Sequence, residues 1–440
     1  MILEQQNTIA PYNLGDRLRL RFATVDDIEP LAQFNGRVHG SPFVTQWTRE
    51  FASPSHPTCG PDWVTLVEDT QTGQIVSSIC LIPQTWTYAG LPFEVGRPEA
   101  VGTDPAYRRR GLVRAQFDVL HAKSEAAVHL AQGITGIPWY YRQFGYEYAI
   151  DLDAGRCVYP SLIPPLKAGE AEAYRLRPMT LDDLPFVMPL YDRQAARSLI
   201  ACPRPEAEWR RDLLGSLSPE PSYHLNYLIE TTGGRPAGYV VAARELWGEQ
   251  FRVMELNVHE DEPLRSVLRA VLRGLKPVAE EAARQQGKGS VILSFRLGVT
   301  HPVFDAASDL FQKIQAPYGW YMRVIDMPGF LNHIAPVLER RLAESALSGY
   351  SGEIKVTEYV RGFKIIVERG VVRSEAWQPG DWNDGVNAWF PPLTFLQILF
   401  GRRSFDDLDY AYPDCFAEDE VAPVLRVFFP KKPSNVLAMA

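Results

Sequence analysis

A basic turn, R-R-R-G-L-V-R at residues 108–114, combines residue types that bind anionic groups. A short apolar strand is expected before it, and Asp104-Pro105 breaks that strand because proline has no N–H donor. After Gly111, apolar residues recur at helical spacing, so a helix is expected to begin at the turn. The first N–H groups of a helix lack partners within it and lie at the positive end of its dipole. The turn therefore predicts a diphosphate site between Arg109 and Arg114.

Two other interpretations of the arginines compete with a diphosphate site: a solvated start of the helix and a contact with nucleic acid. Segments that bind nucleic acid usually belong to basic domains. This chain of 440 residues instead carries a net charge of −8. The acidic balance argues against a nucleic-acid partner and is compatible with a cationic substrate.

The turn and the segment after it resemble a known motif. R-x-x-G-x-G/A after a strand resembles the coenzyme A pyrophosphate loop of the GNAT acetyltransferases, and Val113 stands where that motif has glycine or alanine. The longer string R-R-R-G-L-V-R-A, followed by Y-x-x-F-G-Y at residues 141–146, is similar to the enhanced intracellular survival (Eis) branch. That branch accepts a larger aliphatic residue at the position of Val113. The resemblance implies a GNAT fold and acetyl-CoA as the coenzyme.

The same resemblance assigns residues to the coenzyme. In GNAT proteins the exposed backbone of the cofactor strand pairs with the pantetheine arm, which here implies a strand at 100–103 with contacts from Val101 and Thr103. The full set of coenzyme-binding residues that the resemblance implies is Val101, Gly102, Thr103, Arg108, Arg109, Arg110, Gly111, Leu112, Val113, Arg114, Gly136 and Ile137.

The resemblance also implies the groups that move protons. Tyr141 precedes Gly145 by four residues, the position of the family's general acid, and a phenol with a pKa near ~10 can donate to a thiolate at neutral pH. A buried aromatic side chain without a catalytic role is the alternative for Tyr141. In the Eis branch the terminal carboxylate is the base, which assigns that role to Ala440, although family members end in an aromatic residue. Glu99 is the alternative base, or else a solvated carboxylate.

The composition is that of a globular chain, with 46% hydrophobic residues and no apolar run long enough to span a bilayer. The first residues lack the basic segment and apolar core of a signal peptide. The five cysteines are scattered without metal-ligand spacing, and no histidine pair or carboxylate pair predicts a metal site. We expect reduced thiols, a cytoplasmic location, no bound metal and no membrane contact.

The chain carries two copies of one strand–helix unit. L-R-L-R-F-A-T-V-D-D at residues 18–27 matches Y-R-L-R-P-M-T-L-D-D at 174–183. In each copy we expect a short strand, a threonine N-cap and acids in the first helical turn. A second matching pair, each a strand that runs into a glycine turn, follows at 63–74 and 227–235. In the second copy, acids at 260–262 stand where the first has its arginines, so that copy should not bind coenzyme A.

The remaining residues resemble the sterol-carrier-like third domain of the Eis-like proteins, with a helix expected at 334–346. The expected fold class is α/β (α+β): two tandem GNAT-type mixed-sheet units followed by a sterol-carrier-protein-like α/β domain. The expected boundaries are a catalytic GNAT domain at 15–158, a second, degenerate GNAT domain at 173–326 and the third domain at 327–440. A proline-rich linker is expected at 159–172.

The resemblance predicts an acetyl-CoA-dependent N-acetyltransferase that moves an acetyl group to a primary amine by direct attack. It implies an aminoglycoside, polyamine or lysine-like acceptor and a homo-oligomer, often a hexamer. A group of acids between residues 406 and 420 either forms a solvated face or lines a cleft for such an amine. The alternative function is a non-catalytic protein that binds a small amine or a lipid and retains a coenzyme A site.

Overall fold

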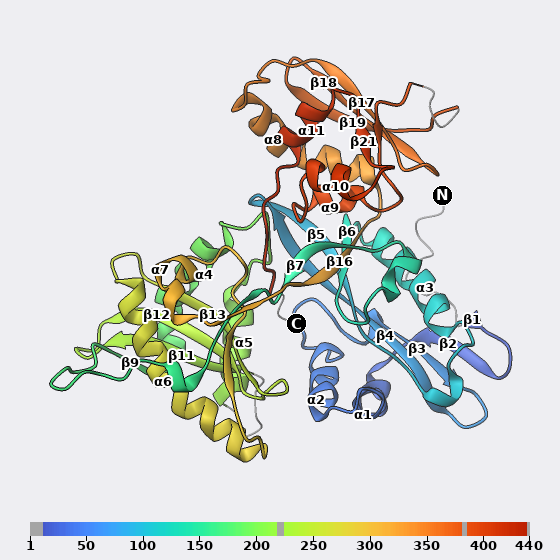
Figure 1. Ribbon diagram of the computed structural model, residues 1–440. Helices are drawn as coiled ribbons and strands as arrows, with labels where there is room; N and C mark the ends of the chain where they lie inside the picture. The colour runs from blue at the N-terminus through green and yellow to red at the C-terminus, as the bar shows by residue number, and fades with distance from the viewer. Residues whose placement is uncertain (1–11, 218–223, 381–384, 438–440) are drawn as a thin grey trace.

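The computed structural model describes residues 12–217, 224–380 and 385–437. Within these ranges the chain forms three β-sheets, each with its own helices, arranged as three units (Figure 1). This arrangement confirms the expected mixed α/β class, with two mixed-sheet units followed by a smaller α/β domain. In the part of the chain that the structure describes, no helix combines the length and the apolar character needed to cross a bilayer.

The first sheet is built on a long hairpin, β4–β5, and the later strands extend it. Its strands in spatial order are β1 (Tyr12–Asn13), β2 (Leu18–Phe22), β3 (Val64–Asp69), β4 (Gln74–Tyr88), β5 (Leu91–Thr103), β6 (Ala131–Ile134), β16 (Tyr318–Val324) and β7 (Glu147–Leu152), and β10 (Ile200–Ala201) pairs with β4. Its helices are α1 (Ile28–His39), α2 (Pro42–Phe51) and α3 (Leu112–Ala126).

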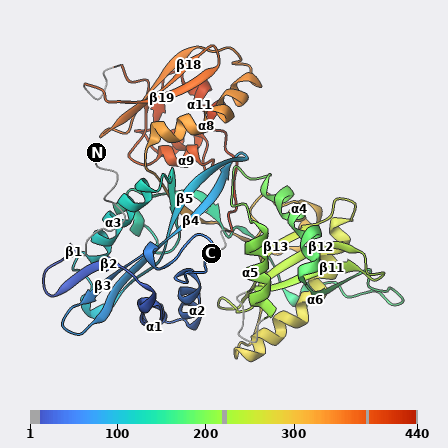
Figure 2. The same ribbon diagram turned by 180° about the vertical axis from the view of Figure 1, so that it is seen from behind.

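Helices α1 and α3 cover opposite faces of this sheet (Figure 2). Successive side chains of a strand point to opposite faces. On β4, Cys80 and Ile82 pack with the core under α1, while Ile79 and Leu81 pack with Phe117 of α3. Both faces of β4 are therefore apolar at residues 79–82, where the sequence I-C-L-I is a continuous hydrophobic run.

The two predicted copies use the same ion pairs. Arg21 donates to both carboxylate oxygens of Asp27 at 2.7 and 2.8 Å, and its Nε donates to Glu68 at 2.9 Å. In the second copy Arg177 binds Asp183 at 2.7 and 2.8 Å and Glu230 at 3.0 Å. In both copies the acid also caps its helical turn by accepting from a threonine N–H, as the sequence repeat predicts.

The second sheet repeats the first. Its order is β15 (Lys313–Gln315), β8 (Gly155–Val158), β14 (Ile292–Phe295), β13 (Gln250–Val258), β12 (Pro236–Ala243), β11 (His224–Thr231) and β9 (Tyr174–Pro178). Its helices are α4 (Leu184–Ala195), α5 (Glu206–Leu217), α6 (Leu264–Gln285) and α7 (Val303–Ala306).

The first two sheets exchange strands along the chain. β8 follows the first unit in sequence, yet it pairs with β14 and β15 of the second sheet. β16 follows the second unit, yet it lies between β6 and β7 of the first sheet. The two units are therefore tied together through backbone hydrogen bonds, which the two sequence copies alone do not indicate.

The third unit packs on the far end of the β4–β5 hairpin. Its sheet has the order β19 (Val371–Trp377), β18 (Gly362–Glu368), β17 (Gly352–Thr357), β20 (Ala388–Trp389) and β21 (Phe416–Ala417). Its helices are α8 (Met327–Ala343), α9 (Phe395–Leu399), α10 (Phe405–Ala411) and α11 (Ala422–Phe428). Helix α8 begins earlier than expected because Pro328 occupies its first turn, where an N–H has no partner to lose. Phe330 of α8 packs against Tyr88 and Phe93 of the hairpin.

Residues 432–437 run from the third unit back between the first two (Figure 1, red). The Asn435 side chain accepts from the Asp153 N–H at 3.1 Å and donates to the Arg296 carbonyl at 3.0 Å. Trp320 Nε1 donates to the Val436 carbonyl at 3.0 Å, and the Val436 side chain is buried. This segment is thus fixed by contacts with both neighbouring units.

Replacing Asn435 by alanine should lower the free energy of unfolding by about 1–3 kcal/mol, because two partly buried backbone groups lose their partner. Lys431→Ala is the matched control, since it removes only a partly exposed ion pair with Asp407 and should cost no more than about 0.5 kcal/mol. Urea denaturation followed by circular dichroism measures both. Equal losses in the two variants would contradict this anchoring of the segment.

Candidate active site

The site begins where two parallel strands of the first sheet part. β5 pairs with β6 only at Val95–Ala131 and Gly96–Gln132, and beyond these positions β5 diverges. The diverging half of β5, the loop after it and residues 134–144 line a cavity of about 820 Å³. A strand that leaves its neighbour presents unpaired N–H and C=O groups, which an extended ligand can bind. The geometry therefore supplies a slot for a pantetheine-like arm.

A β-bulge shapes the wall of this slot. Ser78 of β4 faces Gly102 and Cys80 faces Glu99, so Ala100 and Val101 together oppose one residue. Ala100 has φ of +51°, a left-handed conformation that non-glycine residues rarely adopt. His39, at the end of α1, hydrogen-bonds to the Ala100 backbone, and burial lowers the pKa of its imidazole. The bulge thus interrupts the ladder beside the cavity and is braced by α1.

The basic turn lies at the N-terminus of α3, next to the same cavity. Gly111 caps the helix with φ of +75°, where a Cβ would be strained. Arg108 Nε donates to the Thr103 carbonyl at 3.3 Å, and Arg114 donates to Gln143 Oε1 at 2.9 Å. The helix N-terminus and four arginine side chains that line the cavity form a cradle suited to a diphosphate.

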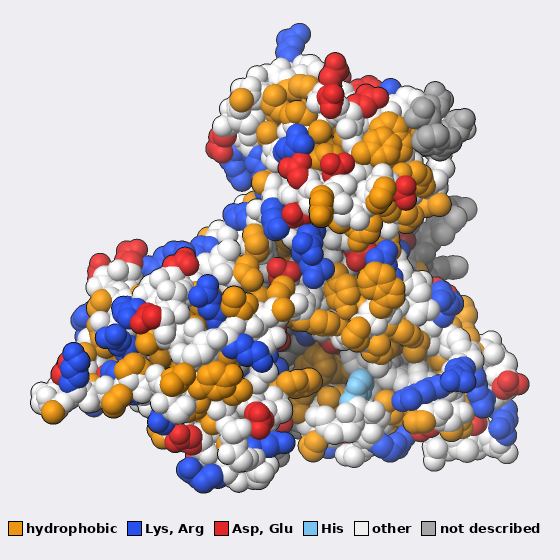
Figure 3. Space-filling model, viewed as in Figure 1, with side chains coloured by type: hydrophobic (Ala, Val, Ile, Leu, Met, Phe, Trp, Pro, Cys, Tyr) orange, Lys and Arg blue, Asp and Glu red, His pale blue; other side chains and the backbone are white. Residues whose placement is uncertain are grey.

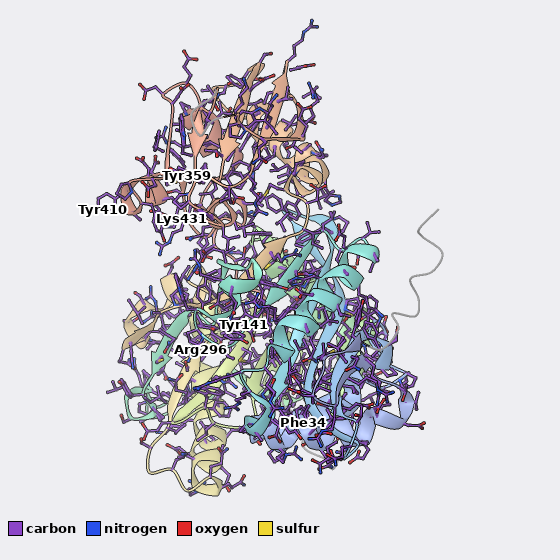
Figure 4. The ribbon with its side chains drawn as sticks, turned by 90° about the vertical axis from the view of Figure 1, so that its right-hand side faces the viewer. Phe34, Tyr141, Arg296, Tyr359, Tyr410 and Lys431 are labelled. Atoms are coloured by element: carbon purple, nitrogen blue, oxygen red, sulfur yellow. The ribbon has the colours of Figure 1, made fainter. Side chains whose placement is uncertain are left out.

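Tyr141 lies in a 3₁₀ helix (Tyr140–Phe144) on the opposite wall and is only 3% exposed. Its ring packs edge-on against Phe117, Tyr140 and Tyr321. Gly136 lies beside its hydroxyl: a Cβ there would stand 3.6 Å from the Tyr141 oxygen. Burial raises the pKa of Tyr141 above its ordinary value of 10.0, and the charge of Glu99 raises it further. The phenol therefore stays protonated and can donate a hydrogen bond or a proton. Figure 4 shows Tyr141 in the middle of the molecule.

The structure describes one of the two candidate bases. Glu99 lines the cavity, and its carboxylate accepts a hydrogen bond from Arg97 Nε at 2.8 Å. Ala440 lies outside the described residues. The segment that leads toward it is held by polar contacts of Ser434 and Asn435 rather than by an aromatic anchor.

The structure brings all described residues that the sequence predicts for the site around one cavity. This set contains Glu99, Val101, Gly102, Thr103, Arg108, Arg109, Arg110, Gly111, Leu112, Val113, Arg114, Gly136, Ile137 and Tyr141. Sequence reasoning missed the lining residues that come from α1 and α2, which are Val38, His39, Val44 and Trp47. They belong to α1 and α2, where they look like ordinary members of an amphipathic helix.

The acids between residues 406 and 420 do not line this cavity, as far as the described residues show. Asp406 and Asp407 pair with Arg426 and Lys431 at the surface of the third unit. Tyr410, labelled in Figure 4, lies at the outer edge of that unit, away from Tyr141. The solvated-face interpretation of these acids fits the structure.

Two strands of the second unit also part, but a later segment of the chain packs into the space between them. β13 and β14 are paired at Gln250–Ile292 through Val253–Phe295, and beyond this they part around a small cavity of about 80 Å³. Residues 433–437 line that cavity together with 254–257 and 297–301. At the turn before α6, Glu262 binds Arg235 at 2.5 Å and accepts from Tyr174 at 2.8 Å. A buried carboxylate at this turn repels phosphate, in contrast to the arginines of the first unit.

Comparison with protein families defines the class of the first unit. Residues 19–149 match the acetyltransferase (GNAT) domain. This match confirms the predicted enzyme class, an acyltransferase, and the predicted coenzyme, acetyl-CoA. No curated protein sequence matches the chain significantly.

Solved structures share the fold over almost the whole chain. A probable N-acyltransferase of unknown function from Enterococcus faecalis is 13% identical, with a TM-score of 0.68 over 96% of this chain and 100% of its own. A GCN5-related N-acetyltransferase from Anabaena variabilis is 14% identical, with a TM-score of 0.65 over 95% and 98%. Eis1 from Mycobacterium abscessus is 15% identical, with a TM-score of 0.58 over 95% and 99%. The architecture of three units is therefore shared with these proteins.

Arg109→Glu should weaken the binding of coenzyme A at least about tenfold, because a negative charge replaces a donor at the diphosphate cradle. Isothermal titration calorimetry measures the affinity. Arg284→Glu makes the same charge change on α6, outside the cavity, and should leave the affinity unchanged. Unaltered affinity in the Arg109 variant would contradict the cradle.

The raised pKa of Tyr141 predicts the alkaline side of the pH profile. A phenol whose pKa lies above 10.0 keeps its proton through the neutral range and up to about pH 10. We therefore expect kcat for acetyl transfer not to fall between neutrality and about pH 10. A stopped assay of acetylated product across this range measures it, and a decline centred below the ordinary tyrosine pKa would rule out Tyr141 as the buried acid.

Proposed function

We propose that this protein is an N-acetyltransferase that transfers the acetyl group of acetyl-CoA to a primary amine. The observation that carries the proposal is the joint position of the arginine cradle, the unpaired strand edge and a buried, protonated tyrosine on one cavity. A cradle and a strand edge alone would serve a protein that only binds coenzyme A. The proton donor opposite them is what a transfer reaction needs.

The proposed reaction needs no covalent acyl-enzyme. Val101 and Thr103 hold the pantetheine arm through their backbone, and the cradle holds the diphosphate. A neutral amine attacks the thioester carbonyl and forms a tetrahedral species. As the C–S bond breaks, the thiolate takes a proton from the Tyr141 hydroxyl, and the proton lost by the amine goes to a base. Glu99 is the base we propose among the described residues, with the terminal carboxylate of Ala440 as the other prediction.

We also propose that the chain belongs to the Eis branch of the GNAT proteins. The R-R-R-G-L-V-R-A and Y-R-Q-F-G-Y strings support this, as does the shared three-unit architecture with Eis1. The cytoplasmic location and the homo-oligomer expected from that branch stay predictions.

Tyr141→Phe should lower kcat by roughly 10²–10⁴-fold while the affinity for coenzyme A changes little, because the ring remains and only the acid is lost. Release of free thiol from acetyl-CoA in the presence of amines measures kcat, and calorimetry measures the affinity. Tyr146→Phe is the matched control: it removes a buried hydroxyl that donates to Gln132 and does not line the cavity.

Normal turnover in the Tyr141 variant would contradict the assignment of the acid. Binding of coenzyme A without thiol release on any amine would instead favour the non-catalytic alternative.

A further inference from the structure

Two chemically different groups of residues stand out in the lining of the cavity. The basic turn contributes Arg108, Arg109, Arg110 and Arg114, which face the coenzyme's phosphates in the proposed function. Helices α1 and α2 contribute Val38, Val44 and Trp47, with His39 beside the bulge. In Figure 3 a hollow opens between the first two units, with hydrophobic side chains and one histidine beside it. The wall that α1 and α2 contribute is thus largely apolar.

The charge of the described lining disfavours a strongly cationic acceptor. Among the lining residues in the described part of the chain, Glu99 is the single acid, and it is already paired with Arg97 at 2.8 Å. An ammonium group that leaves water without a carboxylate partner costs several kcal/mol. For an acceptor with several ammonium groups, the binding free energy would become less favourable by this amount for each group beyond the first.

The apolar wall is also rigid. Trp47 is half-buried on α2, stacked at 6.0 Å on Phe43 and packed edge-on at 5.3 Å against Phe51. A flat aromatic surface held in this way binds another aromatic or aliphatic body without losing side-chain entropy. Among the apolar side chains of this wall, the Trp47 indole N–H is the one hydrogen-bonding group, so the wall offers few partners to the many hydroxyl groups of a sugar.

We infer that the acceptor is a monoamine: one primary amine carried by an aromatic or aliphatic body that packs on Trp47. Polyamines and aminoglycosides are then poor acceptors. The inference rests on the proposed acetyl transfer and narrows its substrate class, and it assigns Trp47 and Val44 as residues that determine specificity.

The test compares kcat/KM for phenethylamine, hexylamine, spermidine and kanamycin with the full-length chain and saturating acetyl-CoA. We expect both monoamines to exceed both polycations at least about tenfold, the usual discrimination of an apolar pocket. A higher kcat/KM for spermidine or kanamycin would overturn the inference and leave the proposed function standing. Acetylation of none of the four amines, with coenzyme A bound, would overturn the proposed function itself.

Two variants test whether Trp47 and Val44 determine the preference for monoamines over polycations. Trp47→Ala should raise KM for phenethylamine at least about tenfold without changing the affinity for coenzyme A. Trp247→Ala, on an exposed side chain of the second unit, is the matched control and should change neither quantity.

Val44→Glu adds a carboxylate to the cavity and should shift the ratio of spermidine to phenethylamine kcat/KM toward spermidine at least about fivefold. An unchanged ratio would overturn the inference even if Trp47→Ala fails to fold.

Discussion

The parting of β5 from β6 is the constraint on which the site depends. Backbone groups of a sheet are paired almost everywhere, so a strand that leaves its neighbour must find other partners. In the first unit that half of β5 carries the bulge at Ala100, leads into the basic turn and faces Tyr141 across the cavity. The helix N-terminus, the exposed strand edge and the acid all follow from where this strand ends.

The second unit has the same strand geometry with different side chains around it. β13 and β14 part in the same way, but residues 433–437 pack into the space and Glu262 occupies the turn. The duplicated unit has thus become a support, because it holds the segment that returns from the third unit. The exchange of β8 and β16 between the two sheets fixes the units against each other. A cavity made from the first unit alone is therefore stabilised by the whole chain.

Local signals in the sequence were sufficient for the helix start after the basic turn and for the repeat, whereas Tyr141 was singled out only through the resemblance to a known motif. Gly111 at a helix start and Arg21–Asp27, repeated as Arg177–Asp183, are decided by residues close in sequence. Contacts between distant segments left no such signal. The Asn435 side-chain amide hydrogen-bonds to the backbone of Asp153 and of Arg296, and no feature of the sequence near Asn435 indicates these contacts. Likewise the sequence alone indicates a core residue at Trp47, because the position of α2 beside the diverging strand is known only from the fold.

The central claim is that the chain has a single coenzyme site, in the first unit, because among the described residues only there do the parted strands stay open and basic. The most direct measurement is the stoichiometry of acetyl-CoA binding to the full chain by isothermal titration calorimetry. The account predicts one molecule bound per chain. Two molecules per chain would show that the second unit also binds the coenzyme, and no binding would contradict the site built from Val101 to Arg114.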